Sequence, residues 1–351
     1  MLVVNWMASK TSGSFLSMRD SNKMEINIED MEIMEKTPIP TPFRIGRVNC
    51  YIFPENDLTV LDPGPSTEEA YKELTKSLRR IGYSIGEIDR VLISHPHMDH
   101  FGLAGRIVDC SGADVFAHKD AVNRLANPID HFKREQEYFQ PFLTSMGLPT
   151  DTVDTVLELP DSYTDYYDPV AVTDILADGE MIDVGVDMEC ISTPGHAPGS
   201  LCFLAATEEV VFTGDHVLPD ITPNPLLTVT PNSNTRTRSL PTYLESLKKI
   251  LGIEATMGFG GHGEPILNLE DRARETIIHH KERKESIAKL VLDHEQVTAF
   301  QIMKKMFPEL PATEMFSGMS EVIGHLDLLE DENRISTIKM NDDLIFYELI
   351  E

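Results

Sequence analysis

Residues 91–100 place the strongest constraint on what this chain can become. The aliphatic, β-branched run at 91–93 is typical of a buried strand, and it is followed at once by four side chains of metal-binding type, namely His95, His97, Asp99 and His100. In extended backbone His95 and His97 point to the same side, and a turn after them can bring Asp99 and His100 toward a second point. The chain has only 12 histidines, so a polar loop with chance histidines explains the cluster poorly. The segment predicts a strand end that serves two metal ions.

Three positions downstream can supply the further donors that such a pair of ions needs. His196 follows a strand pattern and lies on a turn made by Pro194, Gly195 and Pro198. Asp215 ends a hydrophobic strand pattern that finishes in Gly-Asp. His262 lies in a glycine-rich loop, where glycines permit close backbone approach.

With these residues in this order, the chain resembles the metallo-β-lactamase-fold hydrolase superfamily. The resemblance rests on HxHxDH at 95–100 and on the three later residues, so all seven ligand positions of the family are filled. It implies an α/β fold, a four-layer αβ/βα sandwich with the metals at the edge between two sheets. It further implies one metal held by His95, His97 and His196, a second held by Asp99, His100 and His262, and Asp215 as the bridge.

The same resemblance places two residues behind the ligands. Asp62, in the Asp-Pro-Gly segment at 62–64, is expected to contact a ligand histidine, although a plain turn aspartate explains this segment equally well. His216, next to Asp215, is the other residue expected there. We predict no substrate-binding residue from the sequence.

Imidazole and carboxylate ligands around a position open to solvent suit a hydrolytic centre. Two divalent ions, Zn²⁺ first with Mn²⁺ or Fe²⁺ as alternatives, would lower the pKa of a shared water, and the resulting hydroxide would attack a carbonyl carbon. Asp99 would orient this nucleophile and shuttle its proton. We expect an acyl thioester or ester as substrate. The alternatives are an endoribonuclease, a lactonase, or a metal-binding regulatory protein without catalysis.

The net charge and the cysteine content limit which binding partners and which cellular compartment we expect. Acidic residues number 58 against 30 basic ones, a formal net charge of -28, which disfavours nucleic acid and anionic membranes as partners. The four cysteines are far apart and form no CxxC pair, which favours a reducing cytoplasm. We therefore expect a small acyl substrate and a cytoplasmic protein, with a homodimer allowed.

The domain organisation expected from the pattern has three parts. Residues 1–24 form a flexible tail whose apolar start is too short to span a bilayer. Residues 25–283 form the metallo-β-lactamase-like domain, with a helical aromatic insertion at 119–173 that buries its own aromatics, forms a lid over the metals, or does both. The Pro-rich segment at 217–225 leaves Asp215 directly and is expected at the substrate mouth.

Residues 284–351 show three helical patterns and two short strands, which resemble the winged-helix domain of the lactamase-β-like branch of the superfamily. Some proteins of that branch cut RNA, and a winged helix that grips nucleic acid should be basic. This region instead holds six Lys and Arg against fourteen Asp and Glu. We therefore expect it to act as a packing or dimerisation module.

Overall fold

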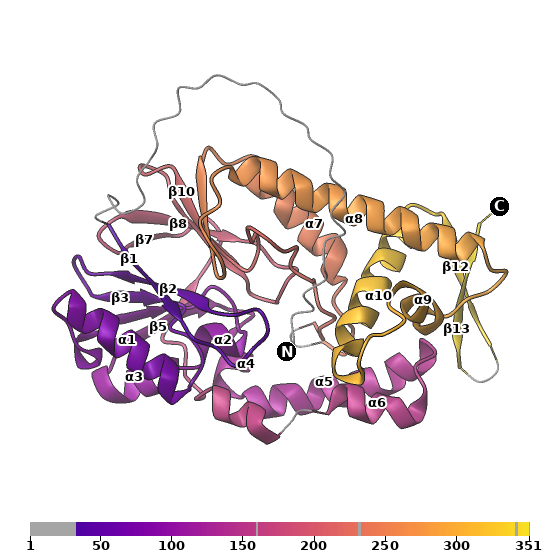
Figure 1. Ribbon diagram of the computed structural model, residues 1–351, viewed down its shortest axis with the longest axis horizontal. Helices are drawn as coiled ribbons and strands as arrows, with labels where there is room; N and C mark the ends of the chain where they lie inside the picture. Colours follow the sequence, from indigo (N-terminus) through magenta and orange to yellow (C-terminus); the bar gives the residue numbers. More distant parts are fainter. Residues whose placement is uncertain (1–32, 159–160, 231–232, 341–342, 351) are drawn as a thin grey trace.

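The computed structural model describes residues 33–158, 161–230, 233–340 and 343–350. The first half of the chain forms a six-stranded sheet in the order β1-β2-β3-β4-β5-β6 (Figure 1). Strands β1 to β3 pair antiparallel, and β3 to β6 pair parallel. The strands are β1 (Glu35–Ile39), β2 (Val48–Phe53), β3 (Thr59–Leu61), β4 (Arg90–Leu92), β5 (Asp114–His118) and β6 (Asp174–Leu176).

The second half forms a five-stranded sheet in the order β11-β10-β9-β8-β7. Its neighbours pair antiparallel except β10 and β11, which run parallel. The strands are β7 (Met181–Asp183), β8 (Asp187–Ser192), β9 (Leu201–Ala205), β10 (Val210–Gly214) and β11 (Met257–Gly260).

Aromatic side chains fill the space between the two sheets. Because side chains alternate along a strand, Tyr51 and Phe53 of β2 face the second sheet, whereas Cys50 and Ile52 face the outer helices. Phe212 of β10 meets Tyr51 and Phe53 with ring centroids 5.0 Å and 5.4 Å away, in edge-to-face geometry. This packing holds the two sheets face to face and brings their strand ends to a common edge.

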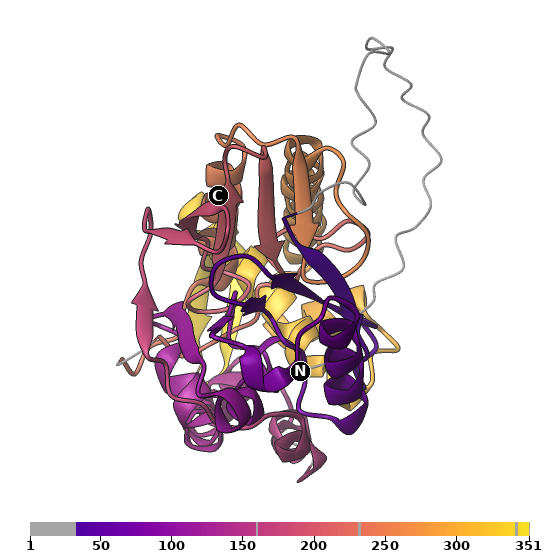
Figure 2. The ribbon, with the colours of Figure 1, turned by 90° about the vertical axis from the view of Figure 1, so that its left-hand side faces the viewer.

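Helices cover the outer face of each sheet and complete four layers (Figure 2). The fold class expected from the sequence is therefore confirmed. Helix α1 begins after Thr67, whose side chain accepts a hydrogen bond from the Ala70 amide at 3.1 Å. The covering helices are α1 (Glu68–Arg80) and α3 (Ala104–Ser111) on the first sheet, and α7 (Ser239–Ile250) and the first half of α8 (Leu269–Leu292) on the second.

The insertion and the C-terminal region share one hydrophobic core. Phe139 of α5 is buried there, 5.4 Å from the ring of Phe316 on α10, and Figure 1 shows α5 and α6 lying against α9 and α10. The elements are α4 (Val122–Ala126), α5 (Pro128–Ser145), α6 (Thr150–Leu157), α9 (Ala299–Met306), α10 (Met315–Asp331), β12 (Ile335–Lys339) and β13 (Ile345–Leu349), with short 3₁₀ turns at Ile85–Glu87, Asp161–Tyr166 and Ala312–Glu314.

This shared core shows what the aromatic face of α5 packs against. Phe139 is buried against the C-terminal helices, and among the described residues of the insertion Arg124 lines the pocket beside the seven metal-binding residues. The insertion therefore does not bury its aromatics only against itself. Two of its tyrosines, Tyr163 and Tyr166, pack on Phe43 with ring centroids 6.4 Å and 5.4 Å away.

The boundary expected at residue 284 lies inside α8, which runs unbroken from 269 to 292. Ala273, in its first half, packs with the second sheet, and Ile287, in its second half, belongs to the C-terminal core. The second half of α8 together with α9, α10 and the β12–β13 hairpin matches the expected three helices and hairpin. Likeness to a winged helix and the division into domains stay predictions. The tail at 1–24 lies outside the described residues.

No helix within the described part of the chain is both long and apolar enough to cross a membrane.

Candidate metal centre

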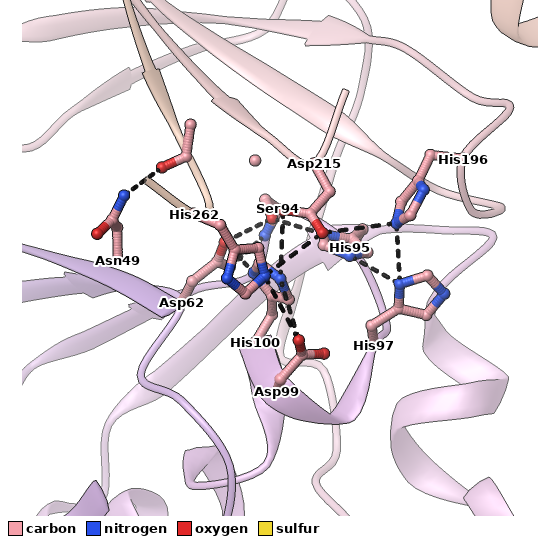
Figure 3. Close-up of polar contacts among 12 residues, drawn as sticks. Asn49, Asp62, Ser94, His95, His97, Asp99, His100, His196, Asp215 and His262 are labelled. Atoms are coloured by element: carbon pink, nitrogen blue, oxygen red, sulfur yellow. Dashed lines mark hydrogen bonds and ion pairs between the residues drawn. The ribbon is translucent and has the colours of Figure 1, made fainter. Parts of the chain in front are cut away.

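The seven residues expected to bind metal all lie where strands end, at one edge of the two sheets (Figure 3). His95 and His97 follow β4, and Asp99 and His100 lie on the short helix α2 (Met98–Phe101). The second sheet supplies the rest, since His196 lies in the β8–β9 turn, Asp215 follows β10, and His262 follows β11. The structure therefore brings together all seven residues that the sequence singled out.

Three imidazoles form the first group. Nε2 of His95 and Nε2 of His196 each lie 3.0 Å from Nδ1 of His97. Three nitrogens at this spacing can face one ion at the 2.0–2.1 Å typical of zinc and histidine.

Asp99, His100 and His262 form the second group. Oδ2 of Asp99 lies 3.5 Å from Nε2 of His262 and 3.9 Å from Nε2 of His100. Asp215 lies between the two groups, with one oxygen 3.5 Å from Nε2 of His100 and the other 3.8 Å from Nε2 of His196. Each group can thus hold one ion, and Asp215 can contact both.

The outer nitrogens of four of these imidazoles have partners of their own. Nδ1 of His100 faces Asp62, Nδ1 of His262 faces the carbonyl of Arg47 at 2.8 Å, and Nδ1 of His196 faces the carbonyl of Asn224 at 3.2 Å. Nδ1 of His95 lies 3.0 Å from the hydroxyl of Ser94. A proton held on Nδ1 by these contacts leaves the lone pair of Nε2 directed at the centre.

Several of the inward atoms make no short hydrogen bond within the described protein, and their charged neighbours are other side chains of the site at 3.5 Å. Nε2 of His100, Nε2 of His262 and Oδ1 of Asp215 are buried and make no hydrogen bond to any described residue. Buried polar atoms are almost always paired, so these three inward-facing atoms fit the ligands of bound cations. The residues present therefore suit a pair of divalent metal ions.

The electrostatics favour the ligand forms of His95, His97 and Asp215. At His100 and His262, in contrast, burial lowers the pKa of the ring, but the nearby carboxylates, Asp215 foremost, together outweigh burial and raise it. Burial lowers the pKa of His95 and of His97, and neighbouring imidazoles lower both further, so these rings are neutral. Burial opposes ionisation of Asp215, but His262 and His100 hold the pKa of its carboxyl well below the ordinary value. Neutral imidazole and ionised carboxylate are the forms that bind metal.

Asp62 makes the contact expected of it. Its carboxylate accepts hydrogen bonds from the Ser94 amide at 2.9 Å and the Ser94 hydroxyl at 2.6 Å, as well as facing His100. It does so from a left-handed backbone conformation, with φ of 55°, which aspartate tolerates better than most residues. The ring of His216, in contrast, packs edge-on against Tyr243 at 5.1 Å, and no hydrogen bond joins its nitrogens to any described residue.

The loop that carries His262 is held by residues that the sequence pattern did not reveal. Asn49 donates to the carbonyls of Gly260 and Gly263, both at 2.9 Å, and the Tyr51 hydroxyl donates to Gly260 at 2.6 Å. Gly261 must lack a side chain, because a Cβ there would collide with Asp215 and His100. The three glycines at 260, 261 and 263 were the only sequence signal of this close approach.

A pocket opens beside the seven residues, and its walls are mainly apolar. Arg124 of α4 and Ser317 of α10 add polar groups, and the remaining side chains include Ile45, Met98, Leu218, Ile221, Pro223, Asn224 and Leu226. The Pro-rich segment at 217–225 therefore lies at the mouth, as expected. Arg124 was missed because a single arginine on a short helix carries no motif.

Comparison with known proteins agrees with this geometry. The sequence profile of the metallo-beta-lactamase superfamily matches residues 44–262, which include all seven residues of the site. The chain belongs to the metallo-beta-lactamase superfamily. It is 29% identical over 299 residues to the probable metallo-hydrolase YqjP of Bacillus subtilis, covering 85% of this chain and 92% of that protein.

A second relative is named for a narrower activity. An atrochrysone carboxyl ACP thioesterase of Aspergillus fumigatus is 29% identical over 159 residues, which cover 42% of this chain and 46% of that enzyme. Among solved structures, a metallo-beta-lactamase family protein from Thermus thermophilus superposes with a TM-score of 0.76 at 25% identity, covering 91% of this chain and 99% of that one. This coverage exceeds residues 44–262, so the shared fold extends beyond the family profile.

Proposed function

We propose that this metallo-hydrolase superfamily member hydrolyses an acyl thioester or ester with two divalent ions, Zn²⁺ in the first place, held by the seven residues. The observation that carries the proposal is the pair of ligand groups joined by Asp215 at the floor of a mainly apolar pocket. The similarity to a fungal acyl-carrier-protein thioesterase supports the choice of substrate class.

Bound at these groups, the metals would supply Lewis acidity and lower the pKa of a water at neutral pH. Asp99 is the residue placed to handle the proton of that water. Both carboxylates line the pocket, but the side chain of Asp99 is 14% exposed, whereas that of Asp215 is only 3% exposed and lies between the two groups. Asp99 therefore orients the attacking water and accepts its proton, and Asp215 sets the spacing of the centre.

The pocket indicates which substrates fit. Leu218, Ile221 and Leu226 offer an apolar wall that suits an acyl chain or ring. Arg124 brings a positive charge to the same pocket, close enough to contribute, after burial and His196, to the lowered pKa of His97. We propose that Arg124 attracts a carboxylate or phosphate of the substrate, since a guanidinium matches the geometry of both anions.

The proposal is tested by metal analysis and by hydrolysis assays on acyl thioesters, simple esters, lactones and single-stranded RNA. We expect thioester or ester turnover that is lost with metal chelation and restored by Zn²⁺. His97→Ala should lose bound metal and nearly all turnover. His118→Ala is the matched control, because His118 ends β5 but belongs to neither ligand group. RNA cleavage without ester turnover, or a fully active metal-free His97→Ala protein, would refute the proposal.

The role of Arg124 is tested on the same substrates. Arg124→Gln should raise KM for substrates that carry an anionic group and leave neutral substrates nearly unaffected. An equal effect on charged and neutral substrates would show that Arg124 acts on the fold or the metal centre instead.

A further inference from the structure

A second cluster of metal-binding side chains lies between the outer helices, apart from the seven residues of the metal centre. It consists of His280 on α8 with Glu321 and His325 on α10, two helices that pack side by side in Figure 1. We propose that His280, Glu321 and His325 form a separate zinc site that joins α8 to α10. This proposal does not depend on the hydrolase function.

The distances suit a metal ion. One ligand atom from each of the three residues lies within 4.8 Å of the others, and Nδ1 of His280 is 3.3 Å from Nε2 of His325. Two nitrogens that share a tetrahedral zinc at 2.0–2.1 Å stand roughly 3.3 Å apart. The observed spacing therefore suits two ligands of one ion as well as it suits a hydrogen bond between the two rings.

The tautomer of His325 is set by its own helix. Its Nδ1 donates to the carbonyl of Glu321, one turn earlier, at 2.6 Å. The lone pair therefore lies on Nε2, the atom that faces His280. Residues four apart share a helix face, so the carboxylate of Glu321 lies on the same side of α10 as the ring of His325.

Burial keeps both rings in the form that binds metal. His280 is 1% exposed and His325 is fully buried, and burial lowers the pKa of each ring, so both are neutral. Nδ1 of His280 is the nitrogen that faces His325, so an ion shared by the two rings would be held by Nδ1, with the ring proton on Nε2.

The carboxylate of Glu321 would supply a third ligand. It would also connect the ion to solvent. The side chain of Glu321 is 14% exposed, and one of its oxygens lies 3.3 Å from Nε of Arg283. A carboxylate accepts at both oxygens, so the ion pair with Arg283 and a bond to zinc are compatible. Two imidazoles and one carboxylate leave one position for water, a donor set that zinc accepts in proteins.

The proposed zinc site would stabilise α10, the helix whose start reaches the pocket beside the metal centre. Ser317, at the start of α10, accepts a hydrogen bond at 3.0 Å from the side chain of Asn224, whose own carbonyl faces His196. An ion that fastens α10 to α8 therefore also supports the segment that positions a ligand of the metal centre.

The test counts zinc in the full-length protein without using catalysis. The chain and its His97→Ala/His262→Ala variant, which disables the metal centre, are saturated with Zn²⁺, desalted and analysed for metal. His325→Gln should remove about one zinc per chain from both proteins. His294→Gln is the matched control, because Nδ1 of His294 also bonds a carbonyl four residues earlier, at 2.7 Å, but His294 has no place in the cluster. Equal zinc content with and without His325→Gln would overturn the proposal.

Thermal unfolding gives a second measurement that does not rely on one substitution. In the His97→Ala/His262→Ala background Zn²⁺ should raise Tm, and both His325→Gln and Glu321→Gln should abolish this rise while far-UV circular dichroism stays unchanged. Glu321→Gln keeps the volume of the side chain, so it decides the question if His325→Gln fails to fold. A zinc-induced rise that survives Glu321→Gln, or no rise in the background protein, would show that the cluster binds no zinc. Failure of the hydrolysis assays would leave this result untouched.

Discussion

Nδ1 of His100 lies 2.9 Å from Oδ2 of Asp62, and both side chains are buried. Asp62 follows β3 and His100 follows β4, so two neighbouring parallel strands bring the pair together. The contact directs Nε2 of His100 toward Asp99 and Asp215. One carboxylate thus orients an imidazole that the chain carries 38 residues later.

Replacing Asp62 by Asn should weaken metal binding without unfolding the protein. Asn keeps the shape of the side chain but removes the charge that holds the proton on Nδ1 of His100, and losing such a partner lowers metal affinity or activity about 10–100-fold. Competition with a chelator measures the zinc affinity. Asp57→Asn, at a half-exposed side chain paired with Arg90, is the control. Unchanged affinity in Asp62→Asn would contradict the orienting role.

Asn224 links a ligand histidine to the C-terminal region. Its carbonyl faces Nδ1 of His196, and its side chain donates to the carbonyl of Ser317. Asn224→Ala removes the side-chain link and lets the carbonyl move, so kcat/KM should fall by up to about tenfold, the equivalent of one hydrogen bond. Steady-state kinetics on the best thioester checks this, with Asn123→Ala on α4, which lines no part of the pocket, for comparison. Wild-type kinetics in Asn224→Ala would exclude the link as a positioning element.

The shared core predicts that the insertion and the C-terminal region unfold together. Phe139 is buried against Phe316, so Phe139→Ala should lower the free energy of unfolding by about 3–5 kcal/mol. Ile129→Ala, at a side chain 47% exposed on the same helix, should change it little. Urea unfolding followed by fluorescence and circular dichroism measures both. A loss in Phe139→Ala as small as that in Ile129→Ala would mean that α5 does not pack as described.

The ionisation of Glu135 should make the stability of the folded protein depend on pH. The residues around Glu135 determine the sign of this dependence. Its side chain is 13% exposed, and although burial opposes ionisation, His131 and Arg124 hold the pKa of its carboxyl below the ordinary value. A lowered folded-state pKa stabilises the protein above the unfolded value of about 4.3, and this stabilisation disappears as pH falls through the lower folded value.

The metal-free protein and its Glu135→Gln variant should therefore differ most in unfolding free energy near neutral pH. The difference should shrink as the pH drops below about 4.3. Urea titrations across this range measure it, with Glu137→Gln, at an exposed position on the same helix, as the control. A difference that grows on acidification would show that burial, and not the neighbouring positive groups, dominates at Glu135.

The local hydrophobic pattern of the sequence was sufficient to predict most of the helices and strands. The residues after Ser66 have the hydrophobic spacing of a helix and form α1 from Glu68, and the apolar segments at 188–192 and 201–205 have the pattern of strands and belong to β8 and β9. These segments are regular because their hydrophobic periodicity agrees with their buried faces in the final fold. The short strands β1, β6 and β11 went unrecognised, since three to five residues carry little periodic signal, and β1 and β11 also contain Pro or Gly.

Only the tertiary structure shows what the aromatic side chains of the insertion pack against. A run of aromatic residues at helical spacing states that one face of α5 will be buried, but it does not state against what. The partner is the C-terminal helices, more than 150 residues later, and no local pattern records that contact. Arg124 enters the pocket for the same reason, through the path of the chain between β5 and α5.

The sequence by itself determined the chemistry of the site, because HxHxDH and three further donors at strand ends name the ligand atoms whatever the exact packing. Only the tertiary structure decided how those atoms are aimed, through Asp62, Asn224 and the backbone of Arg47 behind the imidazoles. It also placed His280 beside His325, two residues on separate helices. Side-chain identity is carried by single positions, whereas direction and neighbourhood arise from contacts between distant segments.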